Sequence, residues 1–406
     1  MLHVRDPLWG SIAVDDTAAR LLDTPAVQRL RQVRQLGLAH LVYPGATHSR
    51  FEHALGAYHL ARRALAKLRE AGALAAVPPD EPAVIAAAAL LHDVGHYPFS
   101  HALEEIGAPL HETLAEQIVT SGAVADILQA DIGADAPRRI SDLIQGRSAS
   151  PLQGLISGSF DLDKIDYLQR DARMCGVPYG EIDEDRLLQS MLVLRDPATG
   201  TSSIGILEKG LSAVETLLFA KYQMYRNVYW HHACRSATAM YKRIVERAVA
   251  RGAVSMASLG SFTDEGLLNA LEFGGGDPML ARLRTRRLFK RAFEAPAAAL
   301  PDADLEWIAD DRTRTAAAER RIAARLGLPA DEVLLDYPAK TQMLGLDVLV
   351  ARKDRTVRRL TQAGLAGAID LPRLAGELYA SARCLRVFTG TRTTLDRDAL
   401  LSSLEP

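Results

Sequence analysis

The stretch LLHDVGHYPFSH, from Leu90 to His101, places three histidines and an aspartate directly after the most apolar run of the chain. Seven of the 11 histidines lie between His48 and His111, and none follows His232. Imidazole and carboxylate groups that meet in space can bind a divalent metal or transfer protons. The sequence therefore predicts that such chemistry belongs to the part of the chain that ends near His232.

His92 and Asp93 form the most suggestive pair in this stretch. Both lie at the end of a segment that is expected to be helical, and successive side chains on a helix diverge by about 100°. They can converge only on something between them, such as a metal ion. A pair of this kind at a helix end also commonly caps or hydrogen-bonds the local backbone. Further ligands must therefore be sought, and His53, in the first turn of an upstream helix, is a candidate.

The segment DLDKIDYLQRD, residues 161–171, has two different faces when it is drawn as a helix. The apolar face is expected to enter the core and carries Ile165, Leu168 and Ala172. The opposite face carries Asp163, Tyr167, Arg170 and Asp171. A solvated helix surface would explain this polar face, and a pocket for phosphate and sugar would explain it equally well.

Helices are expected to position these residues. The pattern over residues 15–36 is helical, with Asp23 or Thr24 as an N-cap. Ser49 and Glu52 have the spacing of a capping box, which predicts that a second helix begins there.

The segment from Ala83 to Asp93 is apolar on every side, which predicts a buried helix. Gly95 is expected to end that helix. Further helical patterns cover residues 110–130, 160–175 and 211–250.

Strand signals are few and lie mostly towards the C-terminus. The segment Met191–Leu207 predicts a β-hairpin about the turn DPATG. GLDVLVARKD and CLRVFTG predict later strands with helices between them. We therefore expect a mainly α fold, with a helical domain over residues 1–270 and a smaller α+β region over residues 271–406. The second region is expected to serve oligomerisation or regulation.

Composition is typical of a globular protein of the reducing cytoplasm. A chain of 406 residues that is 48% hydrophobic can bury a large core, and its net charge of −2 gives no global field for nucleic acid or an anionic membrane. The longest apolar run has nine residues, far below the roughly 20 that span a bilayer. The N-terminus lacks the apolar region of an export signal. Three widely spaced cysteines indicate neither disulfides nor a thiolate zinc site.

Four separated motifs occur in the order found in one enzyme family. They are YPGATHSRFEHALG, LLHDVGHYPFSH, HETLAEQI and DLDKIDYLQRD. With the opening DPLWGSIAVDDTAARLLDTPAVQRLRQVRQLG, they make residues 5 to about 245 resemble the HD-domain deoxynucleoside triphosphate triphosphohydrolases. This is the group of the SAM-and-HD-domain protein and the bacterial dGTPases. The resemblance implies an HD-domain helical bundle that hydrolyses nucleoside triphosphates.

The resemblance also implies one divalent metal ion, with four ligands: His53, His92, Asp93 and Asp163. Two imidazoles and two carboxylates suit Mn, Fe, Mg, Zn, Ni or Co, so the identity of the metal stays open. Four further residues correspond to family residues that line the scissile phosphate, where an imidazole protonates a leaving alkoxide or orients water. They are His96, His101, His111 and Glu112. A buried core histidine is the alternative interpretation for any one of them taken alone.

The resemblance places eight residues around the nucleotide. Phosphate contacts are implied for Arg50, Lys164, Tyr167 and Lys221. Sugar and base contacts are implied for Tyr229, for Asp171 near the 3′-hydroxyl, and for Gln35 and Leu36. The family carries arginine where this chain has Lys221, and a lysine lacks the bidentate fork of arginine. Trp230 similarly replaces a polar residue, which leaves room for a different substrate.

A regulatory nucleotide site is a further implication. Its expected contacts are Asp23, Gln28 and Arg31 to a guanine nucleotide, and Arg286 and Lys290 to a neighbouring activator phosphate. GTP or a dNTP would then bridge the subunits of a homodimer or homotetramer. Six of the ten residues from Arg282 to Arg291 are basic. Without the activator, this stretch is expected to be a solvated helix face or a nonspecific nucleic-acid patch, nucleic acid being the less favoured partner.

The leading hypothesis is a metal-dependent (d)NTP triphosphohydrolase that releases nucleoside and inorganic triphosphate and is activated by a guanine nucleotide. One alternative is a phosphatase that removes phosphates stepwise from nucleotides or analogues. Another is a nucleotide-gated binding protein with low turnover. Cyclic dinucleotides are disfavoured as substrates because no GYP follows the HD motif. Alarmones are disfavoured because the tail shows no synthetase or regulatory module.

Overall fold

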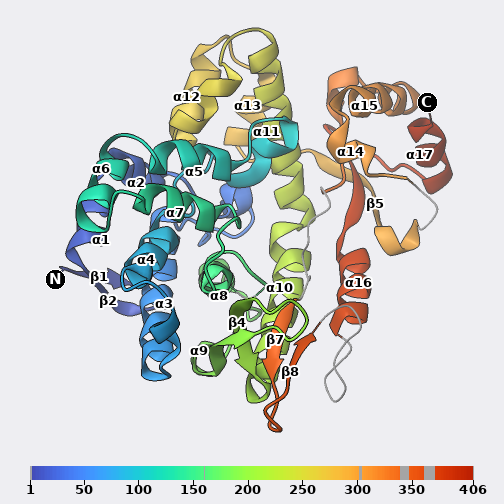
Figure 1. Ribbon diagram of the computed structural model, residues 1–406. Coiled ribbons are helices and arrows are strands. Elements are labelled where there is room, and N and C mark those ends of the chain that lie inside the picture. Colours follow the sequence, from blue (N-terminus) through green and yellow to red (C-terminus); the bar gives the residue numbers. More distant parts are fainter. Residues whose placement is uncertain (1, 160, 301–303, 339–346, 361–370, 406) are drawn as a thin grey trace.

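The structure is a computed structural model that describes residues 2–159, 161–300, 304–338, 347–360 and 371–405. Its body is a helical bundle with small sheets at the edges (Figure 1). The mainly α fold predicted from the sequence is therefore confirmed. The helices of the body that matter most for the site are α3 (Arg50–Glu70), α4 (Glu81–Leu91), α8 (Leu162–Cys175), α10 (Leu211–Met224) and α11 (His232–Ala250).

Helix α3 begins at the predicted capping box. The backbone N–H and the hydroxyl of Ser49 both donate to the Glu52 carboxylate, at 2.6 and 2.9 Å. The helix packs against α4 and α8. Helix α4 is apolar all round, and every residue from Val84 to Leu91 is buried. Burial of each large aliphatic side chain contributes about 1.5–3 kcal/mol, so α4 anchors the helices that carry the polar groups.

Smaller helices surround this centre. They are α1 (Asp16–Leu22), α2 (Pro25–Arg29), α5 (His111–Val119), α6 (Gly122–Asp131), α7 (Ala136–Ile144) and α9 (Glu184–Ser190). Thr24, one of the two predicted N-caps, begins α2 by accepting from Val27 N–H, but the helix ends at Arg29 and not at residue 36, and Leu30–Gln32 form a 3-10 turn. The pattern over residues 110–130 is two helices, α5 and α6, since the chain turns at Ser121.

Three small sheets complete the fold. Strands β1 (Leu2–Asp6) and β2 (Gly10–Val14) form one hairpin, and β3 (Met191–Arg195) and β4 (Ser202–Leu207) form the hairpin that the sequence predicted. Strand β4 then pairs in parallel with β7 (Val348–Ala351), which pairs with β8 (Val357–Leu360). The third sheet has the order β5 (Lys290–Pro296), β9 (Cys384–Thr389) and β6 (Val333–Asp336).

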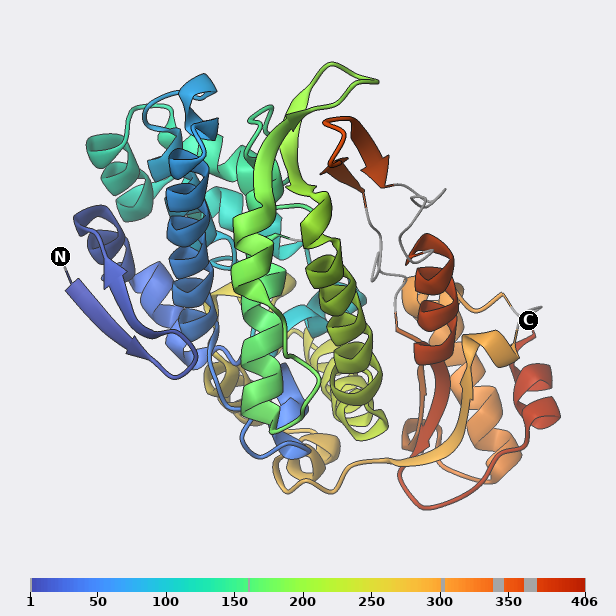
Figure 2. The same cartoon turned by 90° about the horizontal axis from the view of Figure 1, so that it is seen from below.

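In the described residues after 271, strands β5 to β9 combine with five helices, and this part packs on the bundle. The helices are α13 (Pro278–Arg284), α14 (Trp307–Asp310), α15 (Arg312–Leu326), α16 (Leu371–Ala382) and α17 (Arg397–Leu404), and α12 (Asp264–Phe273) precedes them. A core cluster joins α11 to α13, β6 and β9, so hydrophobic contacts cross residue 270. The division at that residue stays a prediction. In Figure 2 the orange and red segments lie beside the long green helices.

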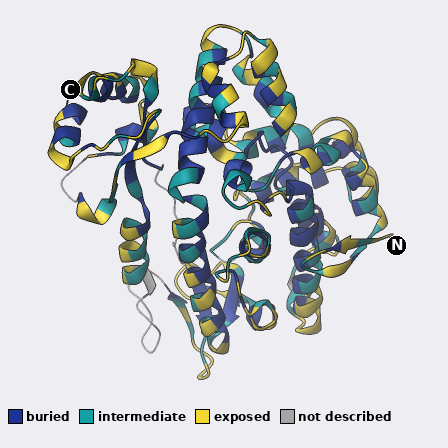
Figure 3. Cartoon of the chain, turned by 180° about the vertical axis from the view of Figure 1, so that it is seen from behind, coloured by how far each residue is buried: buried dark blue, intermediate teal, exposed yellow. Residues whose placement is uncertain are grey.

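The basic stretch from Arg282 to Arg291 is not a single solvated helix, as one expectation had it. It comprises the end of α13, a turn and the start of β5. Arg286 lies in the turn with a φ of 57°, in the left-handed region. The predicted strand GLDVLVARKD is confirmed as β7, although its first two residues lie outside the described part of the chain. Buried residues concentrate on the inward faces of the helices, and exposed ones on the outer faces (Figure 3).

Candidate metal centre and active-site pocket

The four residues that the resemblance assigned to a metal lie together, and we name them the first cluster: His53, His92, Asp93 and Asp163. His53 Nε2 is 3.2 Å from His92 Nε2 and 2.9 Å from Asp163 Oδ1. His92 Nε2 is 3.5 Å from a carboxylate oxygen of Asp93 and of Asp163. Ligands at 2.0–2.2 Å from one ion lie within about 4 Å of each other. The ligand atoms of His53, His92 and Asp93 all lie within 4.8 Å of one another, and Asp163 contacts both histidines, so the donor set suits a single divalent cation.

Three separate segments supply the first cluster. His53 comes from the first turn of α3 and Asp163 from the first turn of α8, where Asp161 caps the helix by accepting from Lys164 N–H at 3.0 Å. His92 is the C-cap of α4, and its Nδ1 contacts the carbonyl of Ala89 at 2.9 Å. Asp93 lies beyond the helix, not in its last turn as the sequence suggested. The turn that follows α4 lets the two neighbours face the same point.

A buried carboxylate that the sequence analysis did not single out fixes the orientation of His53. Asp166 Oδ2 is 2.7 Å from His53 Nδ1, which directs Nε2 at the first cluster. Asp166 also accepts two hydrogen bonds from Arg170 at 2.9 Å and one from the Trp9 indole. Arg170 in turn donates to Asp6 at 2.8 Å. A carboxylate behind a ligating histidine sets its tautomer and its basicity.

Arg170 therefore belongs to this network and not to the polar pocket face predicted for α8. It is 1% exposed and lies away from the pocket-lining residues. The apolar face of α8 is as predicted, because Ile165, Leu168 and Ala172 are all buried. The sequence signal for Asp166 was its place between two core positions with an arginine four residues later. A carboxylate so placed must be paired.

The electrostatics of the first cluster favour a bound cation. Burial alone would lower the pKa of His53, but hydrogen bonds to Asp163 and Asp166 outweigh it and raise that pKa to about 10. Burial opposes ionisation of Asp163 as well, yet contacts with His53 and His92 hold its pKa well below the usual range. The carboxylates thus favour positive charge at this point, and a metal ion can replace the proton.

A second group of side chains lies next to the first, and we name it the second cluster: His96, His101, Glu104 and His111. Nδ1 of His101 and Nδ1 of His111 contact the two oxygens of Glu104, at 2.9 and 2.7 Å. The rings of His96 and His111 stack with centroids 3.7 Å apart. His96 Nε2 is 3.1 Å from Asp93 Oδ1, which connects the two clusters. The three histidines were predicted, whereas Glu104 was not.

Two features hold the loop that carries His96. Arg29 donates to the carbonyls of Val94 and His96, at 3.0 and 2.8 Å. Gly95 packs directly against the start of α5, where a Cβ would overlap the backbone of His111 and Ala115. Only glycine allows this approach, which brings His111 against His96.

Both clusters line one pocket with a volume of about 970 Å³. Its wall includes all eight residues predicted to bind substrate: Gln35, Leu36, Arg50, Lys164, Tyr167, Asp171, Lys221 and Tyr229. It also includes all four predicted catalytic residues: His96, His101, His111 and Glu112. His53 lies behind the wall and is fully buried. The tertiary structure therefore brings together residues that are up to about 190 positions apart, from Gln35 to Tyr229.

The cations of the pocket differ in how they are paired. Arg50 forms an ion pair with Asp93 and donates to Ser100 Oγ. Lys164 lies 2.5 Å from Asp161 Oδ2 and 3.0 Å from the carbonyl of Gly158. Lys221 has no ion pair among the described residues, and burial followed by the charge of Lys164 lowers its pKa to about 8. A polyanion bound nearby would raise the pKa of Lys221 again.

Asp171 and Tyr229 are joined to each other. The Tyr229 hydroxyl donates to Asp171 Oδ2 at 2.7 Å, and Asp171 Oδ1 lies 2.8 Å from His48 Nε2. Each carboxylate oxygen of Asp171 therefore already has a hydrogen-bond partner. Gln35 differs, because its side-chain oxygen is buried without a hydrogen-bond partner among the described residues. Trp230 also lines the pocket and is nearly fully buried, as an aromatic wall.

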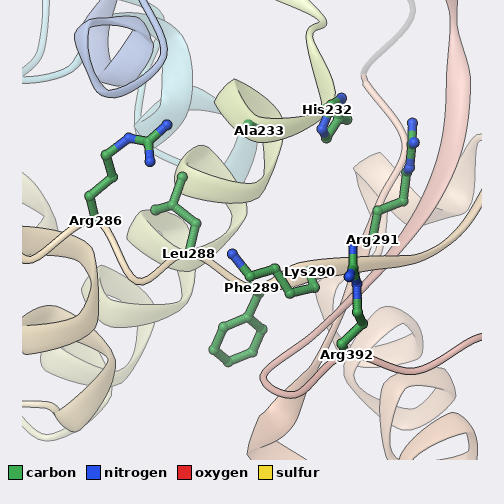
Figure 4. A pocket seen from close by; sticks show the side chains of 8 residues that line it. All are labelled: His232, Ala233, Arg286, Leu288, Phe289, Lys290, Arg291 and Arg392. Atoms are coloured by element: carbon green, nitrogen blue, oxygen red, sulfur yellow. The ribbon is translucent and has the colours of Figure 1, made fainter.

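The residues predicted to form a regulatory site are not brought together within one chain. Arg286 and Lys290 line a separate cavity of about 230 Å³, together with Arg291, Arg392 and His232. Figure 4 shows Arg286 and Arg291 on opposite sides of this cavity. Asp23, Gln28 and Arg31 lie elsewhere: Asp23 ends α1, Gln28 donates to the carbonyl of Leu22, and Arg31 stacks on Phe51 at 3.7 Å.

An α-helical protein that directs two imidazoles and two carboxylates to one point in a polar pocket has the donor set that metal-dependent hydrolases use. The comparison with known families agrees with this class. Residues 50–171 match the HD domain, and residues 182–370 match the HD associated region. The chain therefore belongs to the HD-domain phosphohydrolase family, in the group that includes deoxynucleoside triphosphate triphosphohydrolase relatives.

Several curated proteins resemble the chain. It is 34% identical to uncharacterized protein MJ1154 of Methanocaldococcus jannaschii over 71% of this chain and 59% of the relative. It is 36% identical to uncharacterized protein YwfO of Bacillus subtilis over 61% of this chain and 53% of the relative. The deoxynucleoside triphosphate triphosphohydrolase SAMHD1 of Bos taurus is 28% identical over 57% of this chain and 45% of its own length. The chain thus spans about half the length of these relatives, from 45% to 59%.

Two solved structures share the fold along almost the whole chain. A hypothetical protein from Aquifex aeolicus has a TM-score of 0.73 and 25% identity, covering 99% of this chain and 98% of its own. A phosphohydrolase from Bacteroides thetaiotaomicron has a TM-score of 0.74 and 23% identity, covering 97% of this chain and all of its own. None of the described helices combines the length and apolar character that crossing a membrane requires.

Proposed function

We propose that this protein is a metal-dependent nucleoside triphosphate triphosphohydrolase, which converts a (d)NTP to nucleoside and inorganic triphosphate. The observation that carries the proposal is the single pocket of about 970 Å³, which unites the first cluster, the second cluster and three cationic side chains. Those side chains are Arg50, Lys164 and Lys221. The activity for which the SAMHD1 relatives are named supports the same proposal.

The first cluster is the proposed site of one divalent metal, drawn from Mn, Fe, Mg, Zn, Ni and Co. When bound, such an ion polarises a phosphate oxygen and lowers the pKa of water. Neighbouring side chains position the ligands of the ion. Asp166 orients His53, and Arg50 holds Asp93. His53 and Asp93 are buried, whereas the side chain of Asp163 is 31% exposed and lines the pocket.

The second cluster supplies proton transfer in this proposal. Water forms a new bond to the α-phosphorus while the bond from that phosphorus to O5′ breaks, and the leaving O5′ takes up a proton. His101 is the imidazole best placed to donate it, because its side chain is 59% exposed to the pocket mouth and Glu104 holds its Nδ1. General acid catalysis of this kind typically contributes 10²–10⁴-fold, an order-of-magnitude range.

The cations bind and neutralise the triphosphate. A triphosphate brings close to four negative charges, and charge-assisted hydrogen bonds are about twice as strong as neutral ones. Lys164 and Lys221 share one part of the pocket wall with Tyr167. The Tyr229 hydroxyl and Asp171 form a fixed polar edge suited to a sugar hydroxyl.

The test is product identification. Purified protein, loaded with each metal in turn, is incubated with every common dNTP and NTP, and the products are separated by ion-exchange chromatography. The proposal predicts nucleoside and inorganic triphosphate. Release of diphosphate and monophosphate would instead support the stepwise phosphatase. Nucleotide binding without any product, under every metal, would support the low-turnover binding protein.

Binding of a regulatory nucleotide in the separate cavity of about 230 Å³ is a further candidate function. Four cations line that cavity, at Arg286, Lys290, Arg291 and Arg392, which is a suitable lining for a phosphate chain. We infer that GTP or a dNTP binds there between subunits, where a second copy would complete the contacts. Sedimentation with and without GTP tests this: Lys290→Glu should abolish any GTP-dependent dimer or tetramer. An unchanged sedimentation coefficient in the wild type would contradict it.

A further inference from the structure

The second cluster has the donor set of a metal site as well as of an acid–base site. Its three imidazoles and one carboxylate each offer one ligand atom, and these atoms lie within 4.8 Å of one another. Ligands of one zinc ion at about 2.0–2.1 Å lie no more than about 4.2 Å apart. Shifts of about 1 Å or less would therefore let all four groups share an ion.

The hydrogen bonds in the second cluster mark where an ion would enter. Glu104 lies 2.9 Å from His101 Nδ1 and 2.7 Å from His111 Nδ1. These contacts repeat the relation seen in the first cluster, where His53 Nε2 lies 2.9 Å from Asp163. In both clusters a proton between an imidazole and a carboxylate occupies the position that a cation can take.

His96 provides an independent indication of a missing ligand. Its side chain is 2% exposed, and Nδ1 has no hydrogen-bond partner among the described residues. A buried polar atom without a partner is unfavourable, so a ligand at this nitrogen would stabilise the arrangement. The ring lies against both neighbours, with centroids 3.7 Å from His111 and 4.7 Å from His101. A small rotation would direct this imidazole at the other ligands.

We propose that the second cluster binds a second divalent transition-metal ion of the zinc type, and that its occupancy inhibits hydrolysis. Imidazole-rich sites suit Zn, Cu or Ni, whereas Mg prefers oxygen ligands. The bound ion would take the nitrogen lone pairs that proton transfer needs. The inhibitory role rests on the proposed hydrolase function. The binding site itself does not.

Metal stoichiometry tests the site without any activity measurement. The full chain is stripped with a chelator and titrated with Zn²⁺ by calorimetry and with Co²⁺ by visible absorption. We expect two equivalents for the wild type and one for His101→Ala, whose exposed side chain is not needed for folding. Glu104→Gln should also bind one equivalent. His53→Ala should retain only the second-cluster ion, and the exposed His3→Gln control should bind two.

The inhibitory role is measured on the wild type. Hydrolysis should rise with the first equivalent of Zn²⁺ and fall at least tenfold with the second, while excess Mg²⁺ should cause no such fall. A single equivalent in the wild type, or two in His101→Ala, overturns the second site. Full hydrolysis with two ions bound overturns the inhibition. Two bound ions with no hydrolysis at any ratio refute the proposed function and the inhibition together, and leave the binding site standing.

Discussion

The two clusters use the same chemical groups but differ in how the fold supports them. The first is assembled from three distant segments, at the starts of α3 and α8 and at the end of α4. The second comes from residues 96–111 alone and opens into the pocket through His101. The comparison teaches that burial and long-range assembly favour a permanently held ion. Imidazoles that come from one short segment and are partly exposed can exchange protons, or can bind an ion with lower affinity.

The residues that hold the side chains of the two clusters in position differ in the same way. Behind the first, Asp166, Arg170 and Asp6 form a buried chain of ion pairs that fixes the ring of His53. Behind the second, Arg29 holds only the backbone of the loop. Side-chain orientation is thus fixed in one cluster and adjustable in the other. Single substitutions in and around the first cluster test this difference.

Asp163→Ala should remove the first cluster's ion and reduce turnover by roughly 10³-fold or more, since metal activation of water is worth several kcal/mol. Metal content and product release are measured on the same preparation. Asp126→Ala, on the exposed surface of α6, is the matched control and should behave as the wild type. Retained turnover in Asp163→Ala would refute a catalytic ion at the first cluster.

Asp166→Asn tests whether the network behind His53 matters to the ion. Loss of a carboxylate behind a ligating histidine lowers metal affinity by about 10–100-fold. Burial opposes ionisation of Asp166, but Arg170 and His53 hold its pKa down at about 2, so the wild-type group is charged. Arg170 keeps its bond to Asp6, which should preserve folding. Competition with a chromogenic chelator measures the affinity, and an unchanged value would contradict the positioning role.

Gly56→Ala probes the space in which that network packs. A Cβ at Gly56 would overlap Asp166 Oδ1 and Arg170 Nη2, both of which are fixed by buried hydrogen bonds. Overpacking of this kind costs about 1–3 kcal/mol, which is measured by urea unfolding. Gly376→Ala in α16 has open space and should be neutral or slightly stabilising. Equal free energies of unfolding for both variants would show that Asp166 and Arg170 can shift at little energetic cost.

A variant of Lys221, which lines the pocket near Lys164 and Asp163, should have the mildest effect. The folded-state pKa of about 8 for Lys221 is below its ordinary value of 10.5 because of burial and Lys164. The unfolded chain therefore binds more protons between these two values, and this group makes stability rise with pH there. Nucleotide binding needs the charged form, so KM should rise several-fold above pH 8. Lys221→Arg should flatten that rise, and an identical pH profile would exclude Lys221 from phosphate binding.

Local sequence patterns predicted much of the fold. Ser49 with Glu52, the apolar run of α4, and the hairpin at residues 191–207 each depend on neighbours in the chain, and each appears in the structure. Predictions that extended a pattern too far were wrong. The helix that begins at the predicted cap Thr24 ends at Arg29 and not at residue 36, and the basic stretch from Arg282 to Arg291 is the end of α13, a turn and a strand.

The candidate site shows the same limit. His92 and Asp93 could be recognised by type and order, but Asp166 and Glu104 could not, because their roles depend on partners brought up by other elements. Helical periodicity placed Arg170 on a polar face that could be either solvated or part of a pocket, whereas the structure pairs it with Asp6 from the first strand of the chain. Periodicity gives the face of a helix, and only packing gives what covers that face.

The sequence by itself determined the groups available for chemistry: a histidine-rich first part, acidic residues at helix starts, and cations spread from Arg50 to Lys221. It also determined the helices that carry them, since capping and apolar periodicity act over a few residues. Only the tertiary structure decided which imidazoles share a carboxylate, and which of those pairs are closed from solvent. The reason is physical: the charge and metal affinity of an ionisable group depend on burial and on partners a few ångströms away in space, wherever these lie in the chain.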